Sequence, residues 1–177
     1  MLSCSQRNTG ITTIDGDVET QRISHGEDLV GLISDSGIIR GRLVTKVQDA
    51  YTNDTESYSH FPEGIYFEQF DSLFQISGTV RADTAYHYEK TDLWRLIGNV
   101  VVKNAGGTTC ETSELFWNSR APANSRKSFY TDKFVKITTP TKVTTSEGME
   151  SNQSLTNYIF YSNAMEFEVD EDNSVEE

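Results

Sequence analysis

The chain has 177 residues, a formal net charge of −12 at pH 7 and 36% hydrophobic residues. This length is enough for one domain with a core of its own, and the apolar content argues against a disordered chain. The surplus of carboxylates disfavours binding to a nucleic-acid backbone, and the sequence as given contains no uncharged apolar run as long as a transmembrane helix.

Residues 1–25 are polar and contain one cysteine close to their start. Isolated isoleucines without a sustained period predict a tether, or a loosely held first strand, in this segment. Leu2-Ser3-Cys4 has the apolar-small-cysteine order of a bacterial lipoprotein cleavage site, but the charged and apolar regions that should precede such a site are missing. Cys4 is therefore either the lipidated first residue of a mature lipoprotein or a chance cysteine near a terminus.

From Leu29 onward the sequence predicts antiparallel strands. Two apolar runs flank residues 34–37, a turn-forming cluster whose glycine can adopt a positive φ, and together they predict a hairpin. Pro62 and Gly64 predict a bend or bulge before the alternating residues that end at Phe70. A further short strand is expected over residues 73–80.

Residues 82–117 contain β-rich runs over residues 85–88, 93–102 and 108–117, separated by one polar break and by Gly106-Gly107. Aromatic and β-branched residues recur in them as in half-buried strands, so the runs predict a meander of antiparallel strands. Gly98 is expected at a kink or bulge before Asn99. The glycine pair is expected in a hairpin turn, where a positive φ costs least for glycine.

Strand-like runs continue over residues 130–138, 141–146 and 154–161, with turns expected at residues 139–140 and 146–148. No stretch keeps a helical apolar stripe between caps. We therefore predict an all-β domain of roughly a dozen strands over residues 26–165. The run of carboxylates over residues 166–177 predicts a solvated acidic tail.

No residue pattern in the sequence indicates catalysis, a cofactor or a metal site, so the protein is not expected to be an enzyme. His25, His60 and His87 lie far apart, and none has a second ligand at metal-binding spacing. There is no G-x-S-x-G elbow and no glycine-rich phosphate loop, and Cys110 has no sequence hint of a neighbouring base. Cys110 is read as a small buried hydrophobe inside a strand, with a disulfide to Cys4 as the alternative.

Several sequence blocks follow one another over about residues 28–160: LISDSGIIRGRL, FPEGIYFEQFD, ADTAYHYEKTDLWRLIGNVVVKN, TSELFW, YTDKFVKI and SEGMESNQSLTNY. In this order they resemble the LptC family, the periplasmic component of the lipopolysaccharide transport bridge of Gram-negative bacteria, in its Bacteroides-like form. The resemblance implies a twisted antiparallel β-jellyroll, open along one side, whose apolar interior carries the acyl chains of lipopolysaccharide. Better-known members begin with a transmembrane helix that this sequence lacks, so the anchor is either a lipid on Cys4 or a missing upstream helix.

The resemblance also implies a function and partners. It implies a non-enzymatic subunit that binds lipopolysaccharide and transfers it along the export bridge in the periplasm, anchored to the inner membrane, as a lipoprotein if Cys4 is modified. The expected protein partners are the inner-membrane ABC transporter of lipopolysaccharide export and a periplasmic bridge protein similar to LptA. The chain is acidic and lipid A is anionic, so head-group contacts would depend on local cations such as Arg40, Arg42 or Lys46.

Phe61 lies in the block that matches a lipopolysaccharide-contacting segment of the family. Pleat alternation adds apolar strand positions that are expected to face the same interior groove: Ile65, Phe67, Tyr86, Leu96, Val100, Leu115, Trp117, Val135 and Ile137. Core packing alone would select the same positions, because lipid contact and core packing fall to the same face of a jellyroll.

A membrane-anchored carbohydrate-binding or adhesin-like β-sandwich is the alternative. Exposed aromatic residues such as Trp94 and Tyr66 could stack on sugar rings. An apolar groove along the sheet would favour lipid transfer, and a flat aromatic platform with polar neighbours would favour sugar. A hydrolase is a third reading, which requires two carboxylates that face one another across a cleft.

Overall fold

The structure is a computed structural model that describes residues 20–122 and 124–168. Over these residues it contains eleven strands in one antiparallel sheet and no helix. The predicted all-β fold of roughly a dozen strands is therefore confirmed. The strands are β1 (Gln21–Asp35), β2 (Ile38–Thr52), β3 (Ser57–Phe61), β4 (Ile65–Phe70), β5 (Ile76–Ala82), β6 (Thr84–Tyr88), β7 (Leu93–Asn104), β8 (Thr109–Asn118), β9 (Phe129–Thr138), β10 (Lys142–Ser151) and β11 (Tyr158–Glu168).

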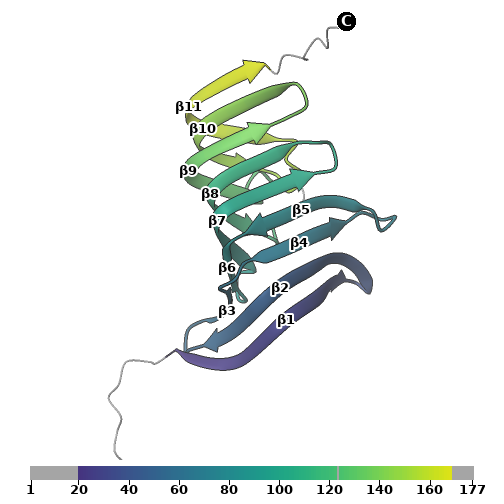
Figure 1. The fold of residues 1–177 in the computed structure, drawn as a ribbon, viewed down its shortest axis with the longest axis vertical. Coiled ribbons are helices and arrows are strands. Elements are labelled where there is room, and N and C mark those ends of the chain that lie inside the picture. Colours follow the sequence, from purple (N-terminus) through teal and green to yellow (C-terminus); the bar gives the residue numbers. More distant parts are fainter. Residues whose placement is uncertain (1–19, 123, 169–177) are drawn as a thin grey trace, which may run out of the picture.

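The sheet is folded into two layers along a crease (Figure 1). β2 pairs with β4 over residues 41–44 and with β3 over residues 49–52. β7 likewise pairs with β6 over residues 93–97 and with β5 over residues 101–104. β3 and β4 are thus two halves of one bent strand, and so are β5 and β6. We call the layer that contains β4 and β5 the front layer, and the layer that contains β3 and β6 the back layer.

Several of the residues with positive φ lie along the crease. They include Asp28 (φ 49°), Gly64 (82°), Gly98 (76°), Asn99 (43°) and Gly148 (87°). The pairing register of β7 with β8 shifts between Ile97 and Val100, which confirms the bulge that the sequence predicts at Gly98. Gly64 confirms the predicted bend before β4, and a Cβ atom there would lie 2.3 Å from the carbonyl oxygen of Ala82. Bulges of this kind bend a strand and raise its local twist, so these residues fold the sheet.

Two predicted turns are confirmed. β1 and β2 are joined through Ser36 and Gly37, whose φ angles are 52° and 80°. Gly106 and Gly107 lie between β7 and β8, and Gly107 has a φ of 83°. A positive φ in such a turn is cheap only for glycine.

Replacing Gly107 with Val should lower the free energy of unfolding by about 1 kcal/mol or more, because valine is strained at positive φ. The matched control is Gly31→Val, since Gly31 does not have a positive φ and no atom lies within 4 Å of its added Cβ. Urea unfolding of both variants measures the difference. Equal stability of the two variants would show that the turn conformation at Gly107 imposes no cost.

The start of the strand expected over residues 73–80 was predicted too early in the sequence. Leu73 and Phe74 lie in the β4–β5 turn, and β5 starts at Ile76. The Asp71 carboxylate accepts hydrogen bonds from the amides of Leu73 and Gln75 at 2.8 and 2.9 Å. Asp71 therefore imposes a turn on residues that are apolar enough to resemble a strand.

The turn expected at residues 146–148 is wrong, because β10 continues through these residues and bends at Gly148. The reversal comes later, between β10 and β11. The Asn152 side chain accepts hydrogen bonds from the amides of Thr156 and Asn157 at 2.9 and 3.1 Å and so forms this turn. The strand predicted over residues 154–161 accordingly starts at Tyr158.

The boundaries expected at residues 26 and 165 fall inside β1 and β11. Glu166 and Glu168, expected in the acidic tail, belong to β11, where Glu168 pairs with Lys142 of β10. The rest of the expected tail, over residues 169–177, and most of the expected tether lie outside the described residues.

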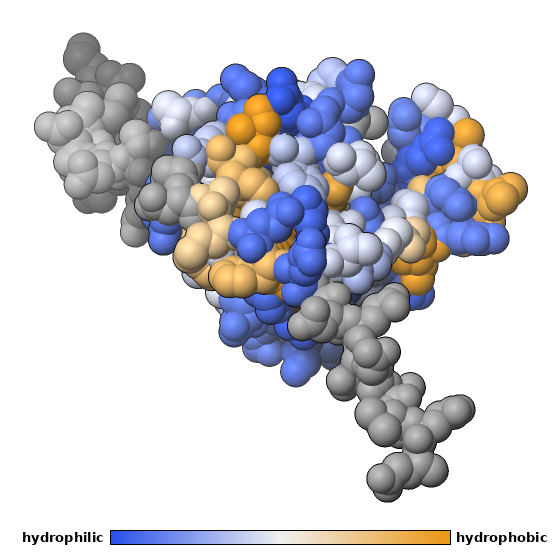
Figure 2. Space-filling model, turned by 90° about the horizontal axis from the view of Figure 1, so that it is seen from above, coloured by the Kyte–Doolittle hydropathy of each residue, from blue (hydrophilic) through white to orange (hydrophobic). Residues whose placement is uncertain are grey.

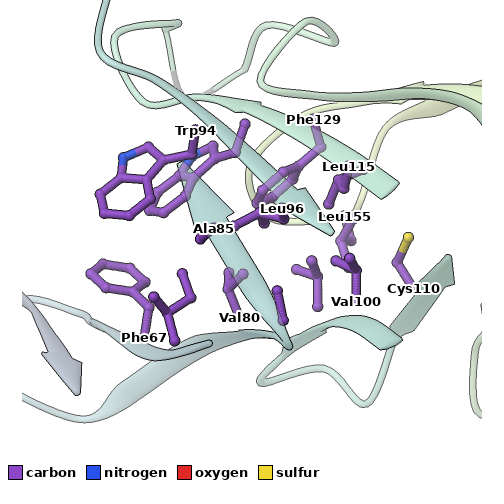
Figure 3. Close-up of a cluster of buried hydrophobic side chains, with 14 of the residues drawn as sticks. Phe67, Val80, Ala85, Trp94, Leu96, Val100, Cys110, Leu115, Phe129 and Leu155 are labelled. Atoms are coloured by element: carbon purple, nitrogen blue, oxygen red, sulfur yellow. The ribbon is translucent and has the colours of Figure 1, made fainter. Parts of the chain in front are cut away.

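The hydrophobic core lies between the two layers (Figure 3). Both layers contribute to it, because every strand from β3 to β10 has at least one buried hydrophobic residue that faces inward. Its buried members are Phe61, Ile65, Phe67, Val80, Ala82, Ala85, Trp94, Leu96, Val100, Val102, Cys110, Leu115, Trp117, Phe129, Val135, Ile137, Met149 and Leu155.

Candidate functional site

The interior between the layers contains every predicted groove residue except Tyr86. The most deeply buried are at most 1% exposed: Phe61, Leu96, Val100, Leu115, Val135 and Ile137. Ile65, Phe67 and Trp117 are at most 6% exposed. The structure therefore brings these residues into one continuous apolar interior, which also serves as the core of the fold.

Tyr86 lies on the opposite side of the sheet, which corrects the inward orientation expected for it. Its neighbour Ala85 is fully buried and fills the inward position of β6. The Tyr86 ring stacks on His60 at 4.4 Å between centroids and lies 6.2 Å from the Tyr58 ring on the outer face of the back layer. Because side chains alternate along a strand, one misplaced residue in a short run such as β6 reverses the assignment.

Aromatic rings form a connected row through the interior. Trp94 lies between Phe61 and Trp117, at 5.5 and 5.8 Å between ring centroids. Trp117 also contacts Phe129 at 5.9 Å and reaches across to Phe67 of the front layer at 5.1 Å. Trp94 is only 5% exposed, so it is not available as the exposed sugar-stacking residue of the alternative reading.

The mouth of the interior, on the side opposite the crease, is closed in this structure. The space there measures about 10 Å³ and is lined by Phe67, Gln69, Val80, Trp117 and Gln153, among others. This is about the space that one water molecule needs, and far less than an acyl chain occupies. An acyl chain could therefore enter only if the layers or the β10–β11 turn moved apart.

The β10–β11 turn spans the mouth and inserts a side chain into the core. Leu155 at its centre is 2% exposed and has a φ of 54°, which is strained for a leucine. The Asn104 side-chain amide, at the end of β7, donates a hydrogen bond to the Ser154 carbonyl oxygen at 2.7 Å. The turn thus connects the end of the back layer to the front layer. Figure 3 shows Leu155 beside Val100 and Leu115.

One polar group points into this apolar interior without a partner. Trp117 Nε1 is buried, and none of the described residues provides a hydrogen-bond acceptor for it. An unsatisfied buried donor costs on the order of 1–3 kcal/mol, so natural proteins rarely retain one without a reason. A ligand oxygen inside the interior would remove this cost.

A charged cluster joins β1 to β2 near the N-terminal end of the sheet. His25 Nδ1 lies 2.7 Å from Asp49 Oδ1, and His25 Nε2 lies 3.3 Å from Glu27 Oε1. Arg22 also donates to Asp49, at 3.2 Å. The hydrogen bonds to Asp49 and Glu27 raise the pKa of His25 above its ordinary value of 6.5, and the bond to His25 lowers the pKa of Asp49 below 3.8.

These pKa shifts predict a pH dependence of stability. A histidine whose pKa is higher in the folded state stabilises the fold fully below pH 6.5, and this contribution is lost as the pH rises through the raised pKa of His25. The Asp49 contribution is present above pH 3.8 and is lost as the pH falls through its lowered pKa. We expect the stability difference between the wild type and His25→Gln to be largest near pH 5–6 and to shrink at alkaline pH. Urea unfolding across this range tests it, and a difference that does not change with pH would contradict the assignment.

No group of three metal-ligating side chains occurs within the described parts of the chain. Cys110 is a free thiol in the core, which confirms the reading of it as a buried hydrophobe, and burial raises its pKa to about 12. Cys4 lies outside the described residues.

The two edges of the sheet differ from its centre. Within residues 20–122 and 124–168, β1 pairs only with β2 and β11 only with β10. Both edge strands carry exposed apolar side chains: Ile23, Val30 and Leu32 on β1, and Ile159, Tyr161, Met165 and Phe167 on β11. Figure 2, a view of the end that carries β11, shows hydrophobic side chains gathered there. Free edges of this kind are where another strand can be added.

The sequence analysis missed Leu155, Asn152 and the buried position of Trp94. A signal for Leu155 is present, since it is the single apolar residue in the polar stretch SNQSLTN. The hydroxyl and amide side chains around it form the turn, and the leucine is the residue left to be buried. The described residues contain no helix that could span a membrane.

A comparison with protein families gives one match. A family model described as "Lipopolysaccharide-assembly, LptC-related" matches residues 33–164. The matched segment begins in β1 and ends in β11, so it includes the crease, both layers and the interior. No curated protein matches the chain.

Proposed function

The chain belongs to the LptC family, and from this membership we propose that it is a non-enzymatic subunit that carries lipopolysaccharide acyl chains between its two layers. Membership implies a role in lipopolysaccharide transport, with partner proteins, in the periplasmic cell envelope. The proposal adds the binding site, the transfer step and the protein contacts.

The unpartnered Trp117 Nε1 is the observation that supports an interior site most directly. Lipid A carries ester, amide and hydroxyl oxygens next to its acyl chains, and one of these could accept the indole hydrogen bond. Each methylene transferred from water into the interior contributes about 0.8 kcal/mol. The interior is closed in this structure, so loading requires either the layers to move apart or Leu155 and its turn to leave the mouth.

The partners attach, in this proposal, at the free edges of β1 and β11. An edge strand presents unpaired N–H and C=O groups, and pairing with a strand of a neighbouring jellyroll continues both the sheet and its interior. An inner-membrane ABC transporter and an LptA-like bridge protein would then occupy opposite ends of the sheet. The exposed apolar side chains of β11 would be buried in one of these contacts.

Attachment to the inner membrane through a lipid on Cys4 completes the proposal. A mature bacterial lipoprotein begins at its modified cysteine, and several acyl chains hold it firmly. Mass spectrometry of the native N-terminus should find Cys4 as an acylated first residue. A peptide that begins upstream of Cys4 and contains its free thiol would show that the protein is anchored in another way.

Photo-crosslinking in living cells tests the interior site. We would place benzoylphenylalanine at Gln69 and at Gln153, which line the mouth from the front layer and the β10–β11 turn. Lipopolysaccharide adducts are expected at both positions. The control is Thr91, an exposed residue on the β6–β7 turn, where no adduct is expected. Adducts at Thr91 that equal those at Gln69 would contradict an interior site.

A second candidate is sugar binding on the outer face of the back layer. Tyr51 and Tyr58 stack there at 5.2 Å, and Tyr58 lies 6.1 Å from Tyr88. Together with Tyr86 these rings form an aromatic platform, built from other residues than the Trp94 and Tyr66 that the sequence analysis named for sugar stacking. Alanine at Tyr58 should weaken binding of the delipidated polysaccharide if the platform is used, and should leave the Gln69 crosslink to intact lipopolysaccharide unchanged.

A further inference from the structure

A large hollow lies on the outer face of the front layer beside the crease, where its floor reaches the core residues Ile65 and Ala82. It measures about 810 Å³ and is lined on one side by Leu29, Val30, Val44 and Tyr66. Its volume is within the range of small-molecule binding sites, about 300–1,000 Å³. The mouth of the interior, by contrast, offers about 10 Å³.

A second hollow of about 670 Å³ continues the first toward β9, and the two share Tyr66 and Arg81. Its lining is polar and contains Arg81, Lys103 and Lys136 together with the hydroxyls of Thr79, Thr109 and Thr138. The two hollows therefore form one groove, apolar at the β1–β2 end and polar at the β7–β9 end. We call it the outer groove.

The strand register explains why this groove is continuous. Val30 pairs with Val44, Val44 with Tyr66, and Tyr66 with Arg81. The row continues from Arg81 to Val101, Glu111 and Lys136. Paired residues of neighbouring strands point to the same face, so this row lies along the outer surface, opposite the core positions Phe67, Val80 and Val102.

The charges of the groove are separated along its length. Arg81 and Lys103 form no ion pair with any described residue, and Lys136 is 3.4 Å from Glu111. The carboxylates of Asp28, Glu63 and Asp83 lie at the other end, beside the crease, together with the single cation Lys46, so that this end keeps an excess of negative charge. An anion would therefore be attracted to Arg81 and Lys103 and repelled from the crease, even though the whole chain has a net charge of −12.

We propose that the outer groove binds an anionic amphiphile with a single apolar chain. Its chain lies along Leu29, Val30, Val44 and Tyr66, and its anionic head lies between Arg81 and Lys103, within reach of the threonine hydroxyls. Burial of the apolar wall provides affinity, and the two unpaired cations set the orientation and the preference for negative charge. This site is separate from the interior, and it does not depend on transport through the interior.

Titration calorimetry with palmitoyl-lysophosphatidylglycerol, kept below its micelle concentration, tests the proposal on the full chain. We expect saturable binding that Arg81→Glu combined with Lys103→Glu weakens about tenfold or more. The matched control reverses two exposed cations elsewhere, Lys90→Glu with Arg126→Glu, and should change the affinity less than about twofold. If both double variants weakened binding equally, the effect would come from the net charge of the protein, and the proposed site would be wrong.

Two further measurements separate the parts of the groove. Glycerol 3-phosphate, which has the anionic head without the chain, should bind on the order of a hundredfold more weakly. Val30→Asp should weaken binding of the lysolipid without changing the melting temperature, because Val30 is exposed. Equal affinity for glycerol 3-phosphate would contradict a role for the apolar wall.

Crosslinking distinguishes this site from the interior. In this experiment the photoreactive group is on the lysolipid, and the protein contains no benzoylphenylalanine. Adducts are expected on peptides that contain Val44 or Tyr66. Adducts confined to peptides that contain Gln69 and Gln153 would place the lipid in the interior and overturn the outer site. The lipopolysaccharide adducts at Gln69 test the proposed function, and the lysolipid adducts test the outer groove. Each of the two proposals can therefore fail without the other.

Discussion

Phe61→Asp is expected to unfold the domain. Phe61 is 1% exposed, and its ring stacks on Trp94 at 5.5 Å inside the core. Removing a buried phenylalanine costs about 3–5 kcal/mol, and a carboxylate without a partner adds several more. This sum is comparable with the whole stability of a typical domain, about 5–15 kcal/mol.

The control for this variant is Phe134→Asp, which makes the same change at a side chain that is 52% exposed on β9. It should retain the cooperative thermal transition of the wild type, measured by circular dichroism. Phe61→Asp should show no such transition. A melting temperature within a few degrees of the wild type for Phe61→Asp would contradict the burial of Phe61 in the core.

Leu155→Ala is expected to destabilise the domain and to open the interior. Truncating a buried leucine costs about 2–5 kcal/mol, and the residual cavity would lie at the mouth beside the space lined by Gln153. The loss should come mainly as faster unfolding if the β10–β11 turn closes late in folding. Chemical denaturation and stopped-flow unfolding measure both quantities.

The same variant tests whether the turn limits lipid entry. If the turn must leave before an acyl chain can enter, Leu155→Ala should bind a fluorescent lipopolysaccharide faster than the wild type. Ile159→Ala, at an exposed position of the neighbouring strand β11, is the control for both stability and binding. Slower or unchanged binding by Leu155→Ala would show that the β10–β11 turn does not limit the entry of lipid.

The bends of the sheet could be predicted because glycine has a distinctive conformational range. Gly64 and Gly98 stand inside strand-like runs, where glycine usually marks a bulge, and both lie on the crease. Gly148 also has a positive φ inside a bent strand, but the sequence analysis assigned it to a turn. A bulge and a turn both require positive φ, and only the pairing of the following residues with β11 distinguishes them.

The candidate site was only partly predictable for a different reason. Apolar alternation correctly placed residues such as Leu96 and Val135 in the interior, because burial is a property of one face of a strand. It could not show whether that interior is open or filled. The closure depends on contacts between distant segments, Phe67 with Trp117 and Asn104 with Ser154, which leave no local pattern.

The pairing of the bent strands follows their order in the sequence. If β3 and β4 are counted as one bent strand, and β5 and β6 as another, each bent strand pairs with the one before it and the one after it along the chain. Each addition therefore closes a short loop, so the sheet can form progressively during synthesis, and it always ends in an unpaired edge until the next strand arrives. A chain stopped before β10 would expose that edge and lack Leu155, and it would be prone to pair with a second unfinished copy.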